Sequence, residues 1–129
     1  KNKVTNRYFN YIYVRMGAHT LIHKRTEDDI WKNLFELPLV ETEKDLSEEE
    51  FLACPQFHAL FAEGEVRMVR TLLRGVKHVL SHRVIYTNFY EVTLPDNSSS
   101  FSSYQRVAVE DLDRYAVPRL IHAFLEKYV

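Results

Sequence analysis

The residues of this sequence that could do chemistry include an adjacent serine and histidine, Ser81 and His82, in the stretch VKHVLSHRVIY at residues 76–86. A serine hydroxyl and a histidine imidazole are the groups that serve as nucleophile and general base in serine hydrolases. However, adjacent side chains on an extended segment point to opposite faces, so the two would not readily bond each other. We therefore expect no catalytic residue here. A loop that reads a ligand and a plain strand entrance, whose hydroxyl bonds local backbone, both remain open.

The metal-binding residue types form no recognisable site. His19 and His23 have an i, i+4 spacing, but they lie in an expected strand, where that spacing separates them by about 13 Å. The run Glu48–Glu50 could hold magnesium, yet acidic residues in a first helical turn are already explained by the helix dipole. Cys54 is the only cysteine, which excludes an internal disulfide and a cysteine-ligated cluster. We expect no metal and no cofactor in these residues.

The composition predicts one soluble domain in a reducing, intracellular compartment. The chain has 129 residues, of which 46% are hydrophobic and 27% charged, and no apolar run is long enough to cross a membrane. It starts with Lys1 and shows no signal peptide, so we expect a piece of a longer protein. A formal charge of −1 is unfavourable for a free-standing DNA-binding protein.

Charge is distributed unevenly along the chain. Acidic residues dominate residues 41–50. The following basic residues occur with no acid between them: Arg67, Arg70, Arg74, Lys77 and Arg83. This asymmetry predicts either a basic edge or an ordinary solvated strand face.

Hydrophobic periodicity and turn residues predict a single α/β (α+β) sandwich, with a mixed sheet flanked by helices. Strands are expected at 7–16, 19–25, 67–73, 77–80, 82–94 and 104–109. Gly17-Ala18 and Arg74-Gly75 are expected to form tight hairpin turns. Residues 30–41 read as an irregular loop into a short strand, because Pro38 prevents a continuous helix. A broken helical region at 47–62, a loop at 95–103 and a final helix at 118–128 complete the order.

Three stretches together resemble the C-terminal domain of MutY-type adenine DNA glycosylases: IWKNLFELPLVE (30–41), VKHVLSHRVIY (76–86) and VEDLDRYAVPRLIHAFLEKY (109–128). The resemblance implies a Nudix-like fold that recognises 8-oxoguanine opposite adenine in duplex DNA during base excision repair. It also implies that a separate N-terminal domain, with a helix-hairpin-helix and an iron–sulfur cluster, removes the adenine. Residues 1–129 would then be a non-enzymatic, monomeric C-terminal fragment, which acts at DNA inside the cell beside its own catalytic domain.

The resemblance also assigns candidate site residues. The family's recognition loop usually reads Phe-Ser-His, and Leu80, Ser81 and His82 match it, with leucine in place of the aromatic residue. Guanine has an acceptor at N7, whereas 8-oxoguanine carries a hydrogen there, so the hydroxyl of Ser81 could accept that hydrogen. His82 would orient the loop or meet a phosphate. Arg83 and Lys77 are the nearest candidates for contact with the DNA backbone.

Two alternatives belong to other functional classes. Nudix hydrolases hold magnesium with a G-x5-E-x7-R-E-x2-E-E-x-G box, which disfavours hydrolysis here, because no glycine lies between Gly17 and Gly64 and no arginine between Arg25 and Arg67. A protein-interaction module on the same scaffold stays open. Its binding surface would be sought at the acidic residues 41–50 and the loop 95–103.

Overall fold

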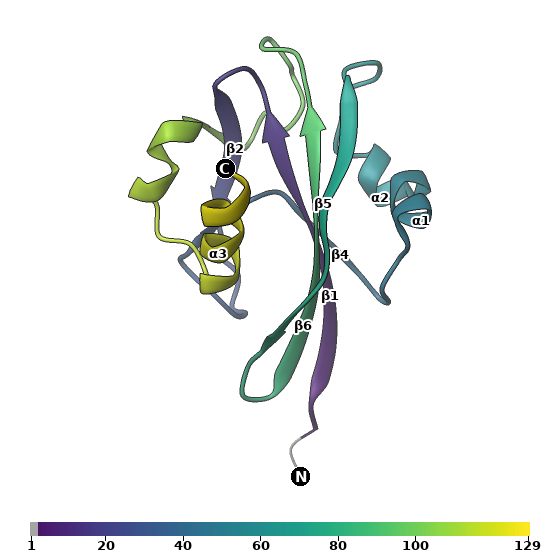
Figure 1. Ribbon diagram of the computed structural model, residues 1–129, viewed down its shortest axis with the longest axis vertical. Helices are drawn as coiled ribbons and strands as arrows, with labels where there is room; N and C mark the ends of the chain where they lie inside the picture. Colours follow the sequence, from purple (N-terminus) through teal and green to yellow (C-terminus); the bar gives the residue numbers. More distant parts are fainter. Residues whose placement is uncertain (1–2) are drawn as a thin grey trace.

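Two β-sheets organise the chain, which a computed structural model describes over residues 3–129 (Figure 1). The four-stranded sheet has the order β4 (Leu39–Thr42), β1 (Thr5–Arg15), β6 (Arg83–Thr93), β5 (Met68–Val79). The three-stranded sheet has the order β3 (Phe35–Glu36), β2 (His19–Lys24), β7 (Gln105–Ala108). β1 and β6 run parallel and the other paired strands run antiparallel. The expected α+β sandwich with a mixed sheet is confirmed.

Four short helical segments complete the fold: α1 (Glu48–Ala53), α2 (Pro55–His58), the 3-10 helix η1 (Val109–Arg114) and α3 (Arg119–Tyr128). A capping box starts α1, since the Ser47 side chain accepts from the backbone N–H of Glu50 and the Glu50 side chain accepts from the backbone N–H of Ser47. Pro55 then starts α2, as expected of a broken helical region. None of the helices in residues 3–129 is long and apolar enough to span a membrane.

Over residues 9–14 of β1 both faces of the four-stranded sheet are covered, and successive side chains alternate between two cores. On one face, Phe89 stacks on Phe124 of α3 with ring centroids 4.1 Å apart. On the other, Tyr90 stacks on Phe51 of α1 at 4.6 Å. Figure 1 shows α3 and the α1–α2 pair on opposite sides of the sheet. The strand expected at 7–16 is therefore present and is buried on both sides in its central part.

The predicted hairpin between residues 7–16 and 19–25 is wrong beyond its turn. A single bridge joins Met16 to His19, and Gly17 adopts a φ of +61° in the turn. β2 then leaves to pair with β3 and β7. The physical reason is that both edges of β1 are already occupied, one by β4 and the other by β6.

The predicted turn at Arg74-Gly75 is also wrong, because β5 runs without a break through it. Gly75 instead marks an irregularity in the pairing with β6, where it adopts a φ of +70° and donates its N–H to Oδ1 of Asn88 at 2.8 Å. The chain reverses later, at Ser81 and His82. Pattern reasoning mistook a bulge for a turn, because a glycine between two apolar runs suits either.

Truncating the aromatic ring that anchors α3 should destabilise the protein. Phe124 is 2% exposed, so Phe124→Ala should lower the free energy of unfolding by about 3 to 5 kcal/mol, as measured by urea denaturation. His122→Ala on the exposed side of the same helix should change it by less than about 0.5 kcal/mol. Similar losses for both variants would mean that α3 is not docked as described.

Candidate functional site

The β5–β6 turn places the predicted site residues at one end of the four-stranded sheet. Leu80 donates its backbone N–H to the carbonyl oxygen of Arg83 at 2.8 Å, which leaves Ser81 and His82 exposed between them. The carbonyl oxygen of His82 accepts from the N–H of Thr5 at 3.0 Å, so the turn is tied to the start of β1. The backbone of this turn is therefore held in place while its two polar side chains face solvent.

Leu80 has a different role from its neighbours. It is half-buried and packs against the core that contains α3. A side chain held in the core in this way anchors the turn. The structure therefore separates the three matched positions into one anchor, Leu80, and two exposed polar groups, Ser81 and His82.

The two basic residues nearest the turn, Lys77 and Arg83, are exposed and form no hydrogen bond or ion pair within residues 3–129. Lys77 pairs with Tyr86 and so shares its face of the sheet. Arg83 lies two residues before Ile85 in β6 and so shares the face of Ile85. Since neighbouring positions of a strand alternate between faces, the two cations point to opposite faces of the sheet. They flank the turn rather than converge on it.

The remaining arginines of the basic run are engaged within the fold. Arg70 donates to Glu91 at 2.7 Å, Arg74 donates to the hydroxyl of Tyr90 at 2.6 Å, and Arg67 donates to nearby backbone carbonyls. The basic run is therefore not a free basic edge. Within residues 3–129, the two members of the basic run without an ion-pair or hydrogen-bond partner are Lys77 and Arg83, which lie next to the turn.

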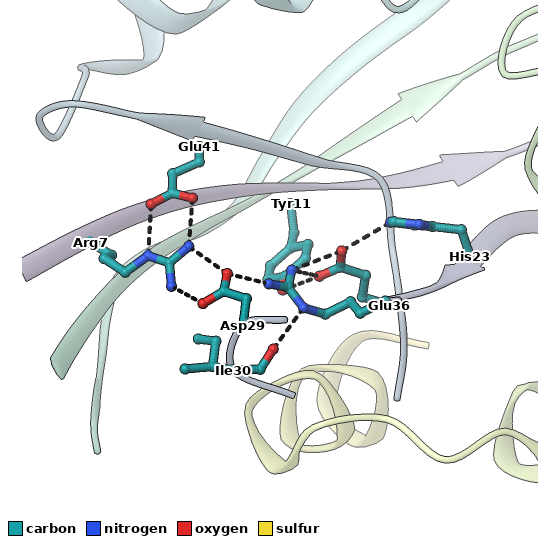
Figure 2. A network of polar contacts seen from close by, with 8 residues as sticks. Arg7, Tyr11, His23, Asp29, Ile30, Glu36 and Glu41 are labelled. Atoms are coloured by element: carbon teal, nitrogen blue, oxygen red, sulfur yellow. Dashed lines mark hydrogen bonds and ion pairs between the residues drawn. The ribbon is translucent and has the colours of Figure 1, made fainter. Parts of the chain in front are cut away.

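A second polar cluster begins at Arg7, which sequence reasoning missed (Figure 2). Its guanidinium donates to both carboxylate oxygens of Glu41, at 2.8 Å each, and to both of Asp29, at 2.8 and 2.9 Å. Glu41 and then Asp29 raise the pKa of Arg7 above its ordinary value. The hydrogen bonds from Arg7 lower the pKa of Asp29 to about 2. One guanidinium thus joins β1, β4 and the loop after β2.

Arg25 extends this network into the protein. It donates to both oxygens of Glu36 at 2.9 and 3.0 Å, to Asp29 at 2.9 Å and to the carbonyl of Ile30 at 3.0 Å. Glu36 is only 2% exposed and also accepts from the hydroxyl of Tyr11 at 2.6 Å. Burial, together with the nearby Glu36 carboxylate, raises the pKa of Tyr11 well above its ordinary value. The buried carboxylate is thereby compensated by hydrogen bonds and charge.

His23 lies at the end of this network. Its Nε2 is 2.9 Å from Oε2 of Glu36, an ion-pair distance without hydrogen-bond geometry. Its ring lies 4.7 Å from that of Tyr104. The sequence signals for the network were the i, i+4 spacing of Arg25 and Asp29 and a lone carboxylate, Glu36, in an otherwise apolar stretch.

The network holds a loop with an unusual backbone. Trp31 and Asn33 adopt φ values of 59° and 73°, a region that a bulky residue rarely enters. Trp31 packs edge-on against Phe9 and His78, at 6.0 and 5.9 Å between centroids. The arginine contacts to Asp29 and Ile30 fix this loop against the sheet. We therefore assign the network of Figure 2 a structural role.

The acidic residues 41–50 serve the fold as well. Glu41 pairs with Arg7, Asp45 accepts from Asn88, and Glu50 caps α1. No group of three or more histidine, cysteine or acidic side chains in the described part of the chain could hold a metal ion. Glu41, Asp45 and Glu50 are thus engaged within the fold rather than gathered into a metal cluster.

The serine-rich loop 95–103 is fastened by one carboxylate. Glu65 accepts from the hydroxyls of Ser98 and Ser100 and from the backbone N–H of Ser99. These hydrogen bonds lower the pKa of Glu65 to about 2. The loop predicted at residues 95–103 is therefore tethered to the segment before β5.

Comparison with known proteins matches a family model described as NUDIX domain to residues 10–127. No curated protein sequence matches the chain. The C-terminal domain of mouse MUTYH, solved in complex with human PCNA, superposes with a TM-score of 0.67 at 15% identity, over 95% of this chain and 86% of that chain. MutT from Methanosarcina mazei Go1 gives 0.62 at 16% identity, over 98% and 95%. At these identities the structural likeness shows a shared fold.

The lowered pKa of Asp29 predicts how stability depends on pH. Its pKa falls from an ordinary 3.8 to about 2 on folding, so its ion pairs contribute stability above pH 3.8 that is lost as pH falls through about 2. Asp29→Asn should lower the free energy of unfolding near pH 7 by about 1 kcal/mol, because the pairs are partly exposed. Urea denaturation between pH 2 and 7 should show a flatter pH dependence for this variant than for wild type.

The neighbouring exposed residue provides the matched control. Asp28 makes no side-chain contact of this kind within residues 3–129, so Asp28→Asn should keep the wild-type curve. An unchanged pH dependence in Asp29→Asn would show that Arg7 and Arg25 do not hold this carboxylate in solution.

Proposed function

The chain belongs to the NUDIX domain family, and we propose that it serves there as a lesion-recognition domain rather than a hydrolase. It recognises 8-oxoguanine opposite adenine in duplex DNA, as the C-terminal domain of a MutY-type adenine DNA glycosylase. The likeness in fold to the C-terminal domain of mouse MUTYH supports this proposal, and the likeness to MutT represents the hydrolase alternative.

The observation that carries the proposal is the exposed Ser81–His82 turn with an uncommitted cation on each side. Ser81 can accept the N7 hydrogen of 8-oxoguanine, whereas toward guanine it would have to donate to N7. Lys77 and Arg83 are free to contact phosphates on either side of the turn. His82, also exposed, orients the turn or meets a phosphate.

The proposed division of labour leaves this domain without chemistry of its own. The adenine bond is cut by the N-terminal catalytic domain of the parent protein, which carries the iron–sulfur cluster. The present residues need no cofactor, act as a monomer at DNA inside the cell, and have two partners: the lesion-containing duplex and that catalytic domain. With a formal charge of −1, the domain alone should bind DNA weakly.

Replacing Ser81 tests lesion reading directly. Ser81→Ala should weaken binding to a duplex with 8-oxoguanine opposite adenine by about 1 to 2 kcal/mol and leave binding to the matching guanine duplex nearly unchanged. Fluorescence anisotropy at low salt measures both affinities. Adding His82→Ala should reduce the preference further, although neighbours in one turn need not act additively.

An exposed serine in the distant loop serves as the control. Ser102→Ala should keep the wild-type preference, since Ser102 is exposed and lies in the loop after β6. If Ser81→Ala and Ser102→Ala bind the two duplexes alike, the turn does not read the lesion and the proposal is wrong.

The hydrolase alternative makes a separate prediction. Residues 18–63 contain no glycine and residues 26–66 no arginine, so the sequence lacks the motif with which Nudix hydrolases bind magnesium. We therefore expect no turnover of 8-oxo-dGTP. Phosphate or pyrophosphate release is measured with and without magnesium. Magnesium-dependent release above a no-protein blank would make the domain an enzyme.

A further inference from the structure

One part of the four-stranded sheet lies outside both cores. It consists of Tyr8 on β1, Val84 and Tyr86 on β6, and Lys77 and Val79 on β5, which we name the tyrosine face. Tyr8 and Lys77 are both in register with Tyr86, and Val79 is in register with Val84, so the five side chains share one face. None of them belongs to either hydrophobic core in the described structure.

Helices leave this half of the sheet uncovered. Figure 1 shows α1 and α2 beside the upper part of the sheet, while the lower part, which ends at the β5–β6 turn, has no helix against it. Val79 is accordingly 66% exposed. Lys77 is exposed as well, whereas Tyr8, Val84 and Tyr86 are half-buried, so the face is a partly exposed aromatic and aliphatic patch and a candidate interaction site.

The rings of Tyr8 and Tyr86 stack on each other, but their hydroxyl groups have no hydrogen-bond partner within residues 3–129. The rings of Tyr8 and Tyr86 stack with centroids 5.6 Å apart and planes at 16°, as cross-strand pairs that stabilise a sheet do. That role explains the rings but not the hydroxyls, which form no hydrogen bond within residues 3–129. Lys77, beside Tyr86, also has no acidic partner there. The face therefore offers two hydroxyls and one cation to a ligand.

We propose that the tyrosine face binds the sugar–phosphate backbone of the DNA duplex whose lesion the adjoining turn reads. This inference rests on the proposed function, because the face and the turn belong to the same β5–β6 hairpin. Tyrosine hydroxyls and lysine are typical phosphate donors, and the two valines offer apolar contact to deoxyribose.

The two surfaces then have different roles. Contacts to phosphate position a protein on DNA without regard to sequence, whereas contacts to a base edge discriminate. The tyrosine face should raise affinity for damaged and undamaged duplexes equally, while Ser81 should raise affinity for the damaged one alone. This difference allows the two proposals to be tested separately.

The experiment compares affinities of the 129-residue chain for an 8-oxoguanine duplex and a guanine duplex, by anisotropy across a salt series. The double variant Tyr8→Phe with Tyr86→Phe removes both hydroxyls but keeps the stacked rings. It should weaken binding to both duplexes by the same factor, about 5- to 30-fold for two phosphate hydrogen bonds. Lys77→Gln should reduce the slope of log affinity against log salt by about 1. Tyr128→Phe, on α3, is the matched control and should change neither affinity.

Each result decides between the proposals. If the tyrosine double variant and Lys77→Gln bind both duplexes like wild type while Ser81→Ala still reduces the preference, the tyrosine face is not a DNA surface and the proposed function stands. If wild type binds neither duplex at low salt, both proposals fail. If wild type self-associates, and Val79→Asp abolishes association without weakening DNA binding, the face joins two copies of the chain and the inference is overturned.

Discussion

The parallel pairing of β1 with β6 is the constraint on which the rest of the structure depends. It runs in one unbroken register from Thr5 opposite Arg83 to Arg15 opposite Thr93. Because the upper parts of both strands are buried on both faces, this pair supplies the aromatic rings onto which α1 and α3 dock from opposite sides. It also occupies the second edge of β1, which sends β2 to another sheet. At its far end, the pair fixes the turn that carries Ser81 and His82.

Charge in this protein is used mainly to hold segments together. Arg7 and Arg25 fasten the loop after β2 to β1, β3 and β4 through Asp29, Glu36 and Glu41. Several charged groups that the sequence presents as a possible binding surface, such as Arg70, Arg74 and Glu41, are therefore already paired within the fold. Within the basic run of the described residues, Lys77 and Arg83 beside the β5–β6 turn form no such pair, and this contrast favours the turn over the basic run as a whole as a candidate binding site.

Much of the fold could be predicted because its local signals agree with its tertiary structure. Ser47, Glu50 and Pro55 mark the broken helical region, and the apolar stripe of α3 marks a docked helix. The errors at Gly17 and Gly75 share one cause. A glycine with positive φ indicates a local change of direction, but whether the strands on either side pair with each other depends on which edges distant strands have taken.

The candidate site was predictable in identity but not in arrangement. Ser81 and His82 could be named from the sequence. That Lys77 and Arg83 face opposite sides of the sheet could not, because it depends on the position of the β5–β6 turn, which was predicted at Arg74-Gly75. The tyrosine face could not be predicted from the sequence for a related reason. Tyr8, Tyr86 and Lys77 are distant or unremarkable in sequence, and only the register of three strands aligns them.

The parallel β1–β6 ladder also has a consequence for how the chain folds. Its two strands are separated by more than half of the sequence, so the central pairing cannot form until residues 83–93 are present. Until then the aromatic side chains of β1 lack their partner strand, and the rings of α3 that cover them come later still. Long-range pairing of this kind slows folding and prolongs the lifetime of exposed strand edges. During synthesis, β1 therefore depends on protection from aggregation, although in the finished protein its central residues are buried.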